Sequence, residues 1–270
     1  MAASELILES REDGVVTLRF NDPDRLNAMT RAMGEAFRAK VGELALDDSL
    51  RAVVITGEGR AFSAGGDLDM LQDKADQGAA APGTAWRQIR DDMGSFYRLF
   101  LSIRDLPCPT IAALNGHAVG AGFCVALGCD FRYVAEKAKL GLNFTRIGVH
   151  PGMAATWTLP RLVGPALAAE LLYTSRMVDG HEAGRIGLAN RVLPVDEVVA
   201  AAQTTAREIA GNAPMAVRAV KEALRRTETA SIEDQLQFEA SAQAKNFESA
   251  DAHEGIAAVR EKRSPRFEGK

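Results

Sequence analysis

The chain has 270 residues, of which 47% are hydrophobic and 25% are charged. This length and composition allow a sizeable buried core, so we expect a globular protein rather than a disordered one. The formal net charge of −4 argues against a nucleic-acid surface, which would need a basic face for phosphates. No run of about 18 apolar residues occurs, so no membrane-spanning helix is predicted, and acidic residues come too early for a signal peptide.

The N-terminal part of the sequence predicts two strands, a helix and a third strand. Residues 5–9 and 14–20 alternate or run apolar around a turn, which is typical of a β-hairpin. Thr30 is a suitable N-cap for a helix that reaches about Leu46. Residues 51–57 form a short β-branched run that stops at a glycine, as a buried strand would.

The middle of the chain alternates strand and helix patterns, and its end is purely helical. Residues 76–83 are small and flexible, so we expect the most mobile segment there, before a long helix that reaches about Leu106. Further strands are predicted within 107–116 and near 130–134. After Pro194 only helix patterns follow. The sequence therefore predicts an α/β core followed by a helical C-terminal part.

The three cysteines are Cys108, Cys124 and Cys129, an odd number without a Cys-x-x-Cys spacing. This pattern predicts neither a disulfide framework nor a zinc site. His181 and His253 lack the partners that would mark a metal site. We therefore expect a cytoplasmic chain without a metal.

Two glycine-rich turns, residues 60–68 and 115–123, each follow an apolar strand and precede a helix pattern. Neither has the spacing of a phosphate loop, a dinucleotide-binding loop or a nucleophile elbow. Glycine lets main-chain N–H groups approach a ligand closely, and a helix N-terminus adds partial positive charge behind them. The pair of turns therefore points to an anion or oxyanion site built from backbone.

At these turns the sequence resembles the crotonase superfamily, the enoyl-CoA hydratase/isomerase family. Four motifs occur in the family's order and near its spacing, and the resemblance extends through the last residues of the chain. The motifs are RLNAM (25–29), ITGEGRAFSAGGDL (55–68), NGHAVGAGF (115–123) and IGVHPGMAATWTLPRLVG (147–164).

The resemblance implies an α/β fold in which ββα units repeat in a spiral. Residues 1–194 would form this crotonase-like core domain, and residues 195–270 a helical region that packs subunits into homotrimers or hexamers. The substrate implied is an acyl-CoA thioester. Coenzyme A would enter as part of that substrate, so no separate cofactor is expected.

In this family, the N–H groups at the positions of Gly66 and Ala121 form an oxyanion hole for the thioester carbonyl. Physical chemistry agrees, because negative charge grows on that oxygen when the α-carbon loses a proton or the β-carbon gains a nucleophile. Losing one preorganised donor of this kind typically raises the barrier by roughly 2.7–4 kcal/mol.

The resemblance also implies which residues bind coenzyme A. They are Arg25, the segment Ala64, Gly65, Gly66, Asp67 and Leu68 with the second oxyanion residue Ala121, and Lys262, which would reach the coenzyme A of a neighbouring subunit. Arginine suits phosphates because its planar fork is always charged. For Arg25 and Lys262 an ordinary surface cation is the alternative. Asp67 is also expected to cap the following helix.

The sequence departs from the family at its acids. The two glutamates that hold water in hydratases would fall at Cys124 and Phe144, and an aspartate used by some relatives would fall at Gly152. Hydration by two glutamates is therefore not expected, because proton transfer needs a group that can carry the proton.

Several side chains are candidates to replace these acids or to shape the site. His150 lies in the loop that carries family catalytic groups, and its ordinary pKa near 6.5 suits an acid/base; a structural histidine is the alternative. Cys124 is more typical of packing than of a nucleophile. His117 is expected to bind loop backbone, and Tyr97 and Trp157 to shape an acyl pocket or to lie in the core.

Three functions remain open from the sequence. The first is an enoyl-CoA hydratase/isomerase-type enzyme, and the second is another reaction on the same scaffold, such as thioester hydrolysis, decarboxylation or double-bond isomerisation. The third is a non-catalytic acyl-CoA-binding subunit. The intact oxyanion motifs favour the first, whereas the missing acids motivate the other two.

Overall fold

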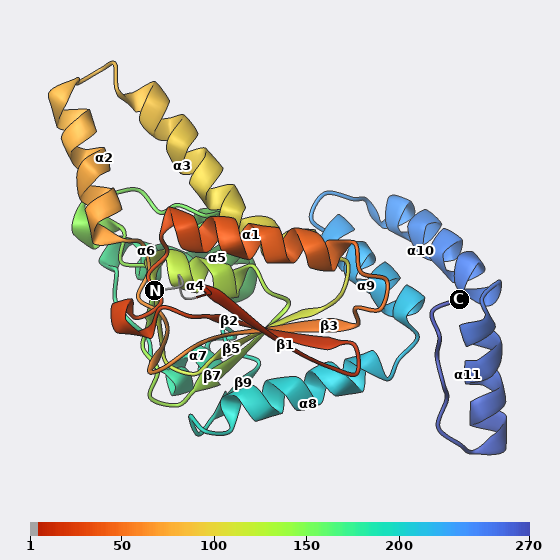
Figure 1. Cartoon of the computed structure of the whole chain (residues 1–270). Helices are drawn as coiled ribbons and strands as arrows, with labels where there is room; N and C mark the ends of the chain where they lie inside the picture. Colours follow the sequence, from red (N-terminus) through yellow and green to blue (C-terminus); the bar gives the residue numbers. More distant parts are fainter. Residues whose placement is uncertain (1–4) are drawn as a thin grey trace.

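The computed structural model of the chain describes residues 5–270, and its centre is a six-stranded sheet of order β1-β2-β3-β5-β7-β9 (Figure 1). The β1–β2 pair is antiparallel and every other neighbouring pair is parallel. The strands are β1 (Ile7–Glu12), β2 (Val15–Phe20), β3 (Ala52–Gly57), β5 (Thr110–Leu114), β7 (Phe131–Ala135) and β9 (Arg191–Leu193). The predicted hairpin and the three predicted inner strands are confirmed.

A second, smaller sheet contains the strands that lead directly into the two glycine turns. It has the parallel order β4-β6-β8, formed by β4 (Ala61–Ser63), β6 (His117–Val119) and β8 (Leu140–Gly141). Strands of the large sheet are followed by one strand of the small sheet and then by a helix, as in β3-β4-α2 and β5-β6-α4. The chain therefore repeats a ββα unit, which confirms the predicted spiral α/β fold.

Helices cover both faces of the large sheet. On one face lie α1 (Arg31–Ala45), the end of α3 (Trp86–Leu101), α4 (Gly120–Leu127) and α5 (Ala155–Val163), and α8 (Val198–Ala210) covers the other (Figure 1). Helix α2 (Leu68–Ala80) projects beyond the sheet and packs on α3. Thr30 caps α1 as predicted, because its Oγ1 accepts the N–H of Met33 at 3.1 Å. Buried rings of Phe20, Phe37 and Phe100 pack between α1, α3 and the sheet, with centroids 5.3 and 6.2 Å apart.

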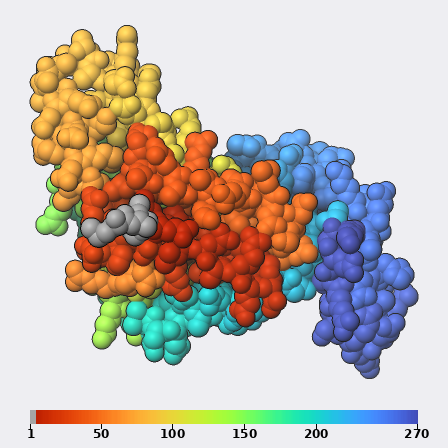
Figure 2. Space-filling model, viewed as in Figure 1, coloured from red at the N-terminus to blue at the C-terminus, as the bar shows by residue number. Residues whose placement is uncertain are grey.

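The chain after Pro194 is helical, as the sequence predicts. After the short α6 (Pro165–Thr174), α7 (Gly180–Arg185) and β9, it forms α8 and then α9 (Pro214–Arg226), α10 (Ile232–Phe247) and α11 (Ala250–Glu261). Whereas α8 packs on the sheet, α10 and α11 lie beyond its end, opposite the projecting α2–α3 hairpin (Figures 1 and 2). The boundary at residue 194 stays a prediction, because α8 shares the core of the preceding part.

One expectation about the chain is wrong in part. The composition of segment 76–83 predicts flexibility, yet Asp76–Ala80 continues helix α2, and the turn to α3 is confined to the few residues around Pro82. Alanine and glutamine in this segment are strong helix formers, and they outweigh the single Gly78. Among residues 5–270, no helix is long and apolar enough to cross a membrane.

Gly122 of helix α4 faces the small sheet at a point where there is no room for a side chain. A Cβ at Gly122 would lie 2.4 Å from Ser63 Oγ and 3.0 Å from the Ser63 carbonyl oxygen. Ser63 cannot turn away freely, because its hydroxyl donates to the carbonyl of Asn27 at 2.8 Å. The strand β4 and the helix α4 can therefore meet only through glycine at this position.

We predict that Gly122→Ala destabilises the protein by about 1–3 kcal/mol, the usual effect of overpacking a core. The matched control is Gly42→Ala on the exposed side of α1, where an added Cβ meets no atom within 4 Å. Because alanine is the better helix former by about 1 kcal/mol, this control should be neutral or stabilising. Thermal unfolding followed by circular dichroism measures both, and equal melting temperatures for the two variants would contradict the packing limit.

Candidate active site

The first glycine turn is shaped by Ser63, at the end of β4. Its Oγ accepts the N–H of Gly65 at 3.1 Å, while the N–H of Met29 donates to the Gly65 carbonyl at 2.8 Å. Gly65 has a φ of +98°, a conformation that favours glycine. These contacts leave the N–H of Gly66 without an acceptor among residues 5–270. The turn therefore presents one free backbone donor.

The second glycine turn leads from β6 into helix α4. Gly120 begins the helix with a φ of +50°, and the N–H of Ala121 has no acceptor within the described part of the chain. All residues of α4 are buried, so the partial positive charge of this helix end acts in a poorly solvated environment. A second backbone donor is therefore available, strengthened by the helix.

The two donors lie at one place because the turns touch. A Cβ built on Gly65 would lie 2.7 Å from the carbonyl oxygen of Val119 and 3.7 Å from the backbone nitrogen of Ala121. No side chain could separate turns that approach so closely. The backbones of the two predicted turns are thus in contact, and a shared oxyanion site formed by Gly66 and Ala121 stays a prediction.

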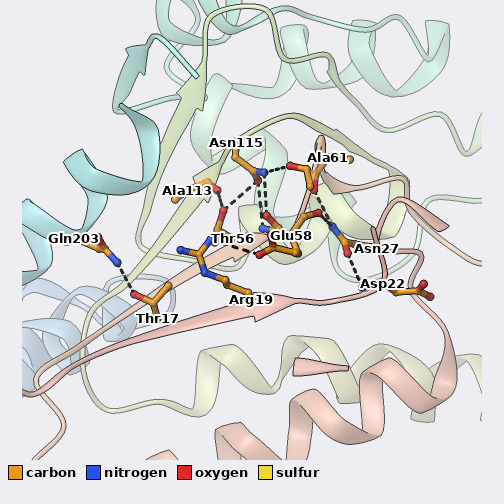
Figure 3. A network of polar contacts seen from close by, with 12 residues as sticks. Thr17, Arg19, Asp22, Asn27, Thr56, Glu58, Ala61, Ala113, Asn115 and Gln203 are labelled. Carbon is orange, nitrogen blue, oxygen red and sulfur yellow. Dashed lines mark hydrogen bonds and ion pairs between the residues drawn. The ribbon is translucent and has the colours of Figure 1, made fainter. Parts of the chain in front are cut away.

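Two asparagine side chains fix the loop that precedes the first turn (Figure 3). Asn27 donates from Nδ2 to the carbonyls of Glu58 and Ala61, both at 2.9 Å. Asn115 donates from Nδ2 to the carbonyls of Gly57 and Gly59, at 2.9 and 3.0 Å. The motifs that contain these asparagines are recognised by their glycines and turns. The sequence alone therefore does not predict that the two side chains hold the loop through these hydrogen bonds.

Arg25 and Asp67 form an ion pair at the mouth of the first turn. Asp67 also caps α2 as predicted, because its Oδ1 accepts the N–H of Met70 at 3.0 Å. The Arg25 side chain is 50% exposed, so its outer edge is open to a phosphate. Ala64 and Leu68 flank the same turn and are exposed. These predicted binding residues therefore form one surface around the turn.

Next to this surface, an open groove of about 490 Å³ runs between α1, α2 and α3. Met70, Met93 and Phe96 supply its apolar wall, and Asp67 lies at its edge. Methionine side chains adapt readily to the shape of a flexible chain. The rest of the lining is polar or charged and includes the ion pair of Lys74 and Asp92, so the groove combines an apolar wall with a charged one.

Lys262 is not brought to the site of its own chain. It is exposed and ends α11 in a left-handed conformation, at φ +56°. Figure 1 places α11 at the opposite end of the molecule from α2. The predicted role of Lys262 in a neighbouring subunit stays a prediction.

The positions of the missing acids surround the second turn. Cys124 is fully buried, and burial raises the pKa of its thiol far above the usual range. Its Sγ donates to the carbonyl of Gly152 at 3.7 Å. Cys124 is therefore a neutral packing residue with no thiolate character at neutral pH. Phe144 packs half-buried against the core and has no proton to exchange.

The two histidines of the site region differ in role. The N–H of Lys139 donates to His117 Nδ1 at 2.9 Å, so His117 binds loop backbone as predicted. His150 is exposed, and its Nδ1 lies 2.8 Å from the carbonyl oxygen of Pro151, to which it donates. Its Nε2 is left for solvent or ligand. A catalytic role for His150 stays a prediction.

Known proteins share this architecture over the whole chain. The family model described as enoyl-CoA hydratase/isomerase matches residues 10–270. The chain is 34% identical to the 1,2-epoxyphenylacetyl-CoA isomerase of Escherichia coli, covering 98% of this chain and 99% of the relative. It is 33% identical to the crotonyl-CoA hydratase of Syntrophomonas wolfei, covering 99% of both chains.

Solved structures agree with the sequence comparison. The enoyl-CoA hydratase from Bacillus anthracis superposes with a TM-score of 0.88 at 34% identity, covering 98% of this chain and all of that one. Its match includes the C-terminal helices as well as the spiral core. Sequence and fold lead to the same conclusion: this chain belongs to the enoyl-CoA hydratase/isomerase (crotonase) family and is an acyl-CoA enzyme of that type.

Proposed function

We propose that this enzyme binds the carbonyl oxygen of an acyl-CoA thioester between the N–H groups of Gly66 and Ala121, and stabilises the enolate that forms there. The observation that carries this proposal is the contact between the two turns, where Gly65, which has no side chain, lies against Val119 and Ala121. Negative charge on that oxygen would meet two preorganised donors and a helix N-terminus. Arg25 would pair with a phosphate of coenzyme A.

The reaction proposed for this site is hydration or isomerisation of an enoyl thioester. Support comes from the relatives, which include a hydratase and an isomerase at similar identity. Hydration of crotonyl-CoA, followed by the loss of absorbance of the conjugated thioester, tests it directly. No turnover across several chain lengths would remove hydration from the proposal.

A second candidate is another reaction of the same enolate, such as hydrolysis, decarboxylation or migration of a double bond. The observation that favours it is the loss of all three family acids at Cys124, Phe144 and Gly152. A mass-spectrometric screen of products from a panel of acyl-CoA esters discriminates these reactions. Tight binding of the esters without any product would instead favour a binding subunit.

We predict that Gly66→Pro abolishes turnover while the fold is retained, because proline removes the N–H proposed to bind the thioester oxygen. Turnover of the acyl-CoA ester found in the screen is the measurement, and circular dichroism checks the fold. Gly83→Pro is not a suitable control, because Gly83 has a φ of +79° that proline cannot adopt. Gly42→Ala is the control variant instead. A folded variant with its full rate would mean that the first donor is misassigned.

We predict that His150→Gln leaves acyl-CoA binding unchanged and lowers turnover of an enoyl-CoA by about 10²–10⁴-fold, the usual worth of a general acid/base. An exposed imidazole can pass a proton between solvent and the nucleophile that adds at the β-carbon. An unchanged rate in the variant would exclude His150 from catalysis.

We also propose that the chain assembles as a trimer or a dimer of trimers through its helical end. Large apolar side chains are exposed on these helices, namely Val220, Leu224, Ile232, Leu236, Phe247, Ile256 and Val259. Apolar surface of this extent is typical of subunit contacts. Lys262 lies just after α11, where it could reach a neighbouring subunit.

Sedimentation at micromolar concentration should therefore give the mass of three or six chains. Leu224→Glu, at a side chain 65% exposed on α9, is expected to dissociate the assembly because it adds a charge to the proposed interface. Leu46→Glu, at a side chain 86% exposed after α1, is the control and should leave the mass unchanged. A monomeric wild-type chain would contradict the proposal.

A further inference from the structure

A tyrosine hydroxyl fills the space that one of the missing acids would need. A Cβ built on Gly152 would lie 2.5 Å from Oη of Tyr97 and 2.6 Å from its Cζ. Gly152 therefore cannot carry a side chain while Tyr97 keeps this position. A carboxylate side chain at position 152 and the phenol of Tyr97 would occupy the same space, so the two cannot be present together.

This hydroxyl lies beside the helical turn that presents the second oxyanion donor. Cys124 follows Ala121 by three residues, so both face the same side of α4. Cys124 is tied to the Gly152 carbonyl through its thiol, and Gly152 contacts Tyr97. One helical turn spans only about 5.4 Å. Tyr97 is therefore linked to the helical turn of the proposed second donor through Gly152 and Cys124.

The Tyr97 hydroxyl is free to bind a ligand. The side chain is half-buried on α3, and Oη has no hydrogen-bond partner among the described residues 5–270. Burial raises the pKa of Tyr97 above its ordinary value. The group is therefore a neutral phenol with an unused O–H donor at physiological pH.

The charged groups around Tyr97 do not replace it in this role. Arg31 of α1 and Lys74 of α2 face the preceding turns of α3, where they contact Ser95 and Asp92. From α4 the facing titratable group is Cys124, whose thiol stays neutral. From the segment that contains Gly152 it is His150, which is exposed and donates to a backbone carbonyl.

We propose that the Tyr97 hydroxyl is the catalytic proton donor to the acyl α-carbon, taking over the part of the missing family carboxylates. This inference rests on the proposed enolate function. In the step, the phenol O–H bond breaks and a C–H bond forms at the α-carbon. The enolate electron pair supplies that bond, the thioester carbonyl re-forms, and the phenolate regains its proton from solvent water. His150 would act separately, at the β-carbon.

Deuterium exchange at the α-carbon isolates this step. Butyryl-CoA has no double bond to hydrate, so in D₂O it reports only removal and return of the α-proton, which mass spectrometry can follow. Tyr97→Phe removes a single oxygen that has no partner within residues 5–270, and should leave the melting temperature and the dissociation constant for butyryl-CoA unchanged. We expect exchange to slow by about 10²–10⁴-fold.

The pH dependence separates a catalytic phenol from a merely structural one. Removal of the α-proton needs the phenolate, so wild-type exchange should rise about tenfold per pH unit while the pH lies below the phenol pKa. Because burial raises that pKa, no plateau is expected below about pH 10. Tyr97→Phe should lose this rise. Incorporation of 3-fluorotyrosine at position 97, which is more acidic, should bring the plateau to lower pH and tests the role without removing the ring.

Two controls make the outcomes distinct. Tyr133→Phe removes a hydroxyl that donates to Thr205 at 2.9 Å, away from the turns, and should keep full exchange. Gly66→Pro should lose exchange with Tyr97 intact.

A wild-type chain that neither binds nor exchanges butyryl-CoA would overturn the proposed function and this inference with it. Wild-type exchange that persists unchanged in Tyr97→Phe would overturn only this inference. Exchange lost in His150→Gln but kept in Tyr97→Phe would also overturn it, because the α-proton would then pass through the imidazole.

Discussion

The structure depends on the close approach of two peptide turns that carry no side chains between them. Gly65 lies against the Val119 carbonyl, and Gly122 lies against Ser63, at distances that a Cβ could not occupy. Because strand β4 and helix α4 come so close, the two glycine turns touch, and the proposed pairing of the Gly66 and Ala121 N–H groups depends on this contact. Electrostatic stabilisation of this kind needs donors that are already in place, since reorganising them during the reaction would cost much of the gain.

The ββα repeat explains how the chain reaches this arrangement. Each repeat places one strand in the large sheet and one in the small sheet, so successive turns emerge at the same edge of β4 and β6. The clamps by Asn27 and Asn115 then fix the loop between β3 and β4 from two sides (Figure 3). The two side-chain amides donate to backbone carbonyls that would otherwise lack hydrogen-bond partners. The loop is therefore held rigidly, although it forms no β-sheet hydrogen bonds.

Much of this could be predicted from the sequence, because its signals are local. Hydrophobic runs and caps indicate the strands and α1, and the spacing of the four motifs indicates the paired glycine turns. Tyr97 could not be assigned, since its contact with Gly152 joins residues 55 positions apart through tertiary packing alone. The helix at Asp76–Ala80 is missed for the opposite reason: small residues look flexible in a sequence, whereas alanine extends a helix that is already nucleated at Asp67.

The backbone donors proposed to stabilise the enolate do not depend on the family acids that this sequence lacks. An oxyanion hole lowers the energy of an enolate whichever group moves the proton, so the backbone part of the site is compatible with several proton carriers. A buried carboxylate beside an enolate would repel it, whereas a neutral phenol adds no charge and can still donate. Replacing an acid at position 152 by the ring of Tyr97 thus exchanges a carboxylate, which is ionised at neutral pH, for a phenol that stays protonated. Such a site would favour protonation of an enolate formed by addition or migration over abstraction of an unactivated α-proton, and this preference follows from the raised pKa of the phenol.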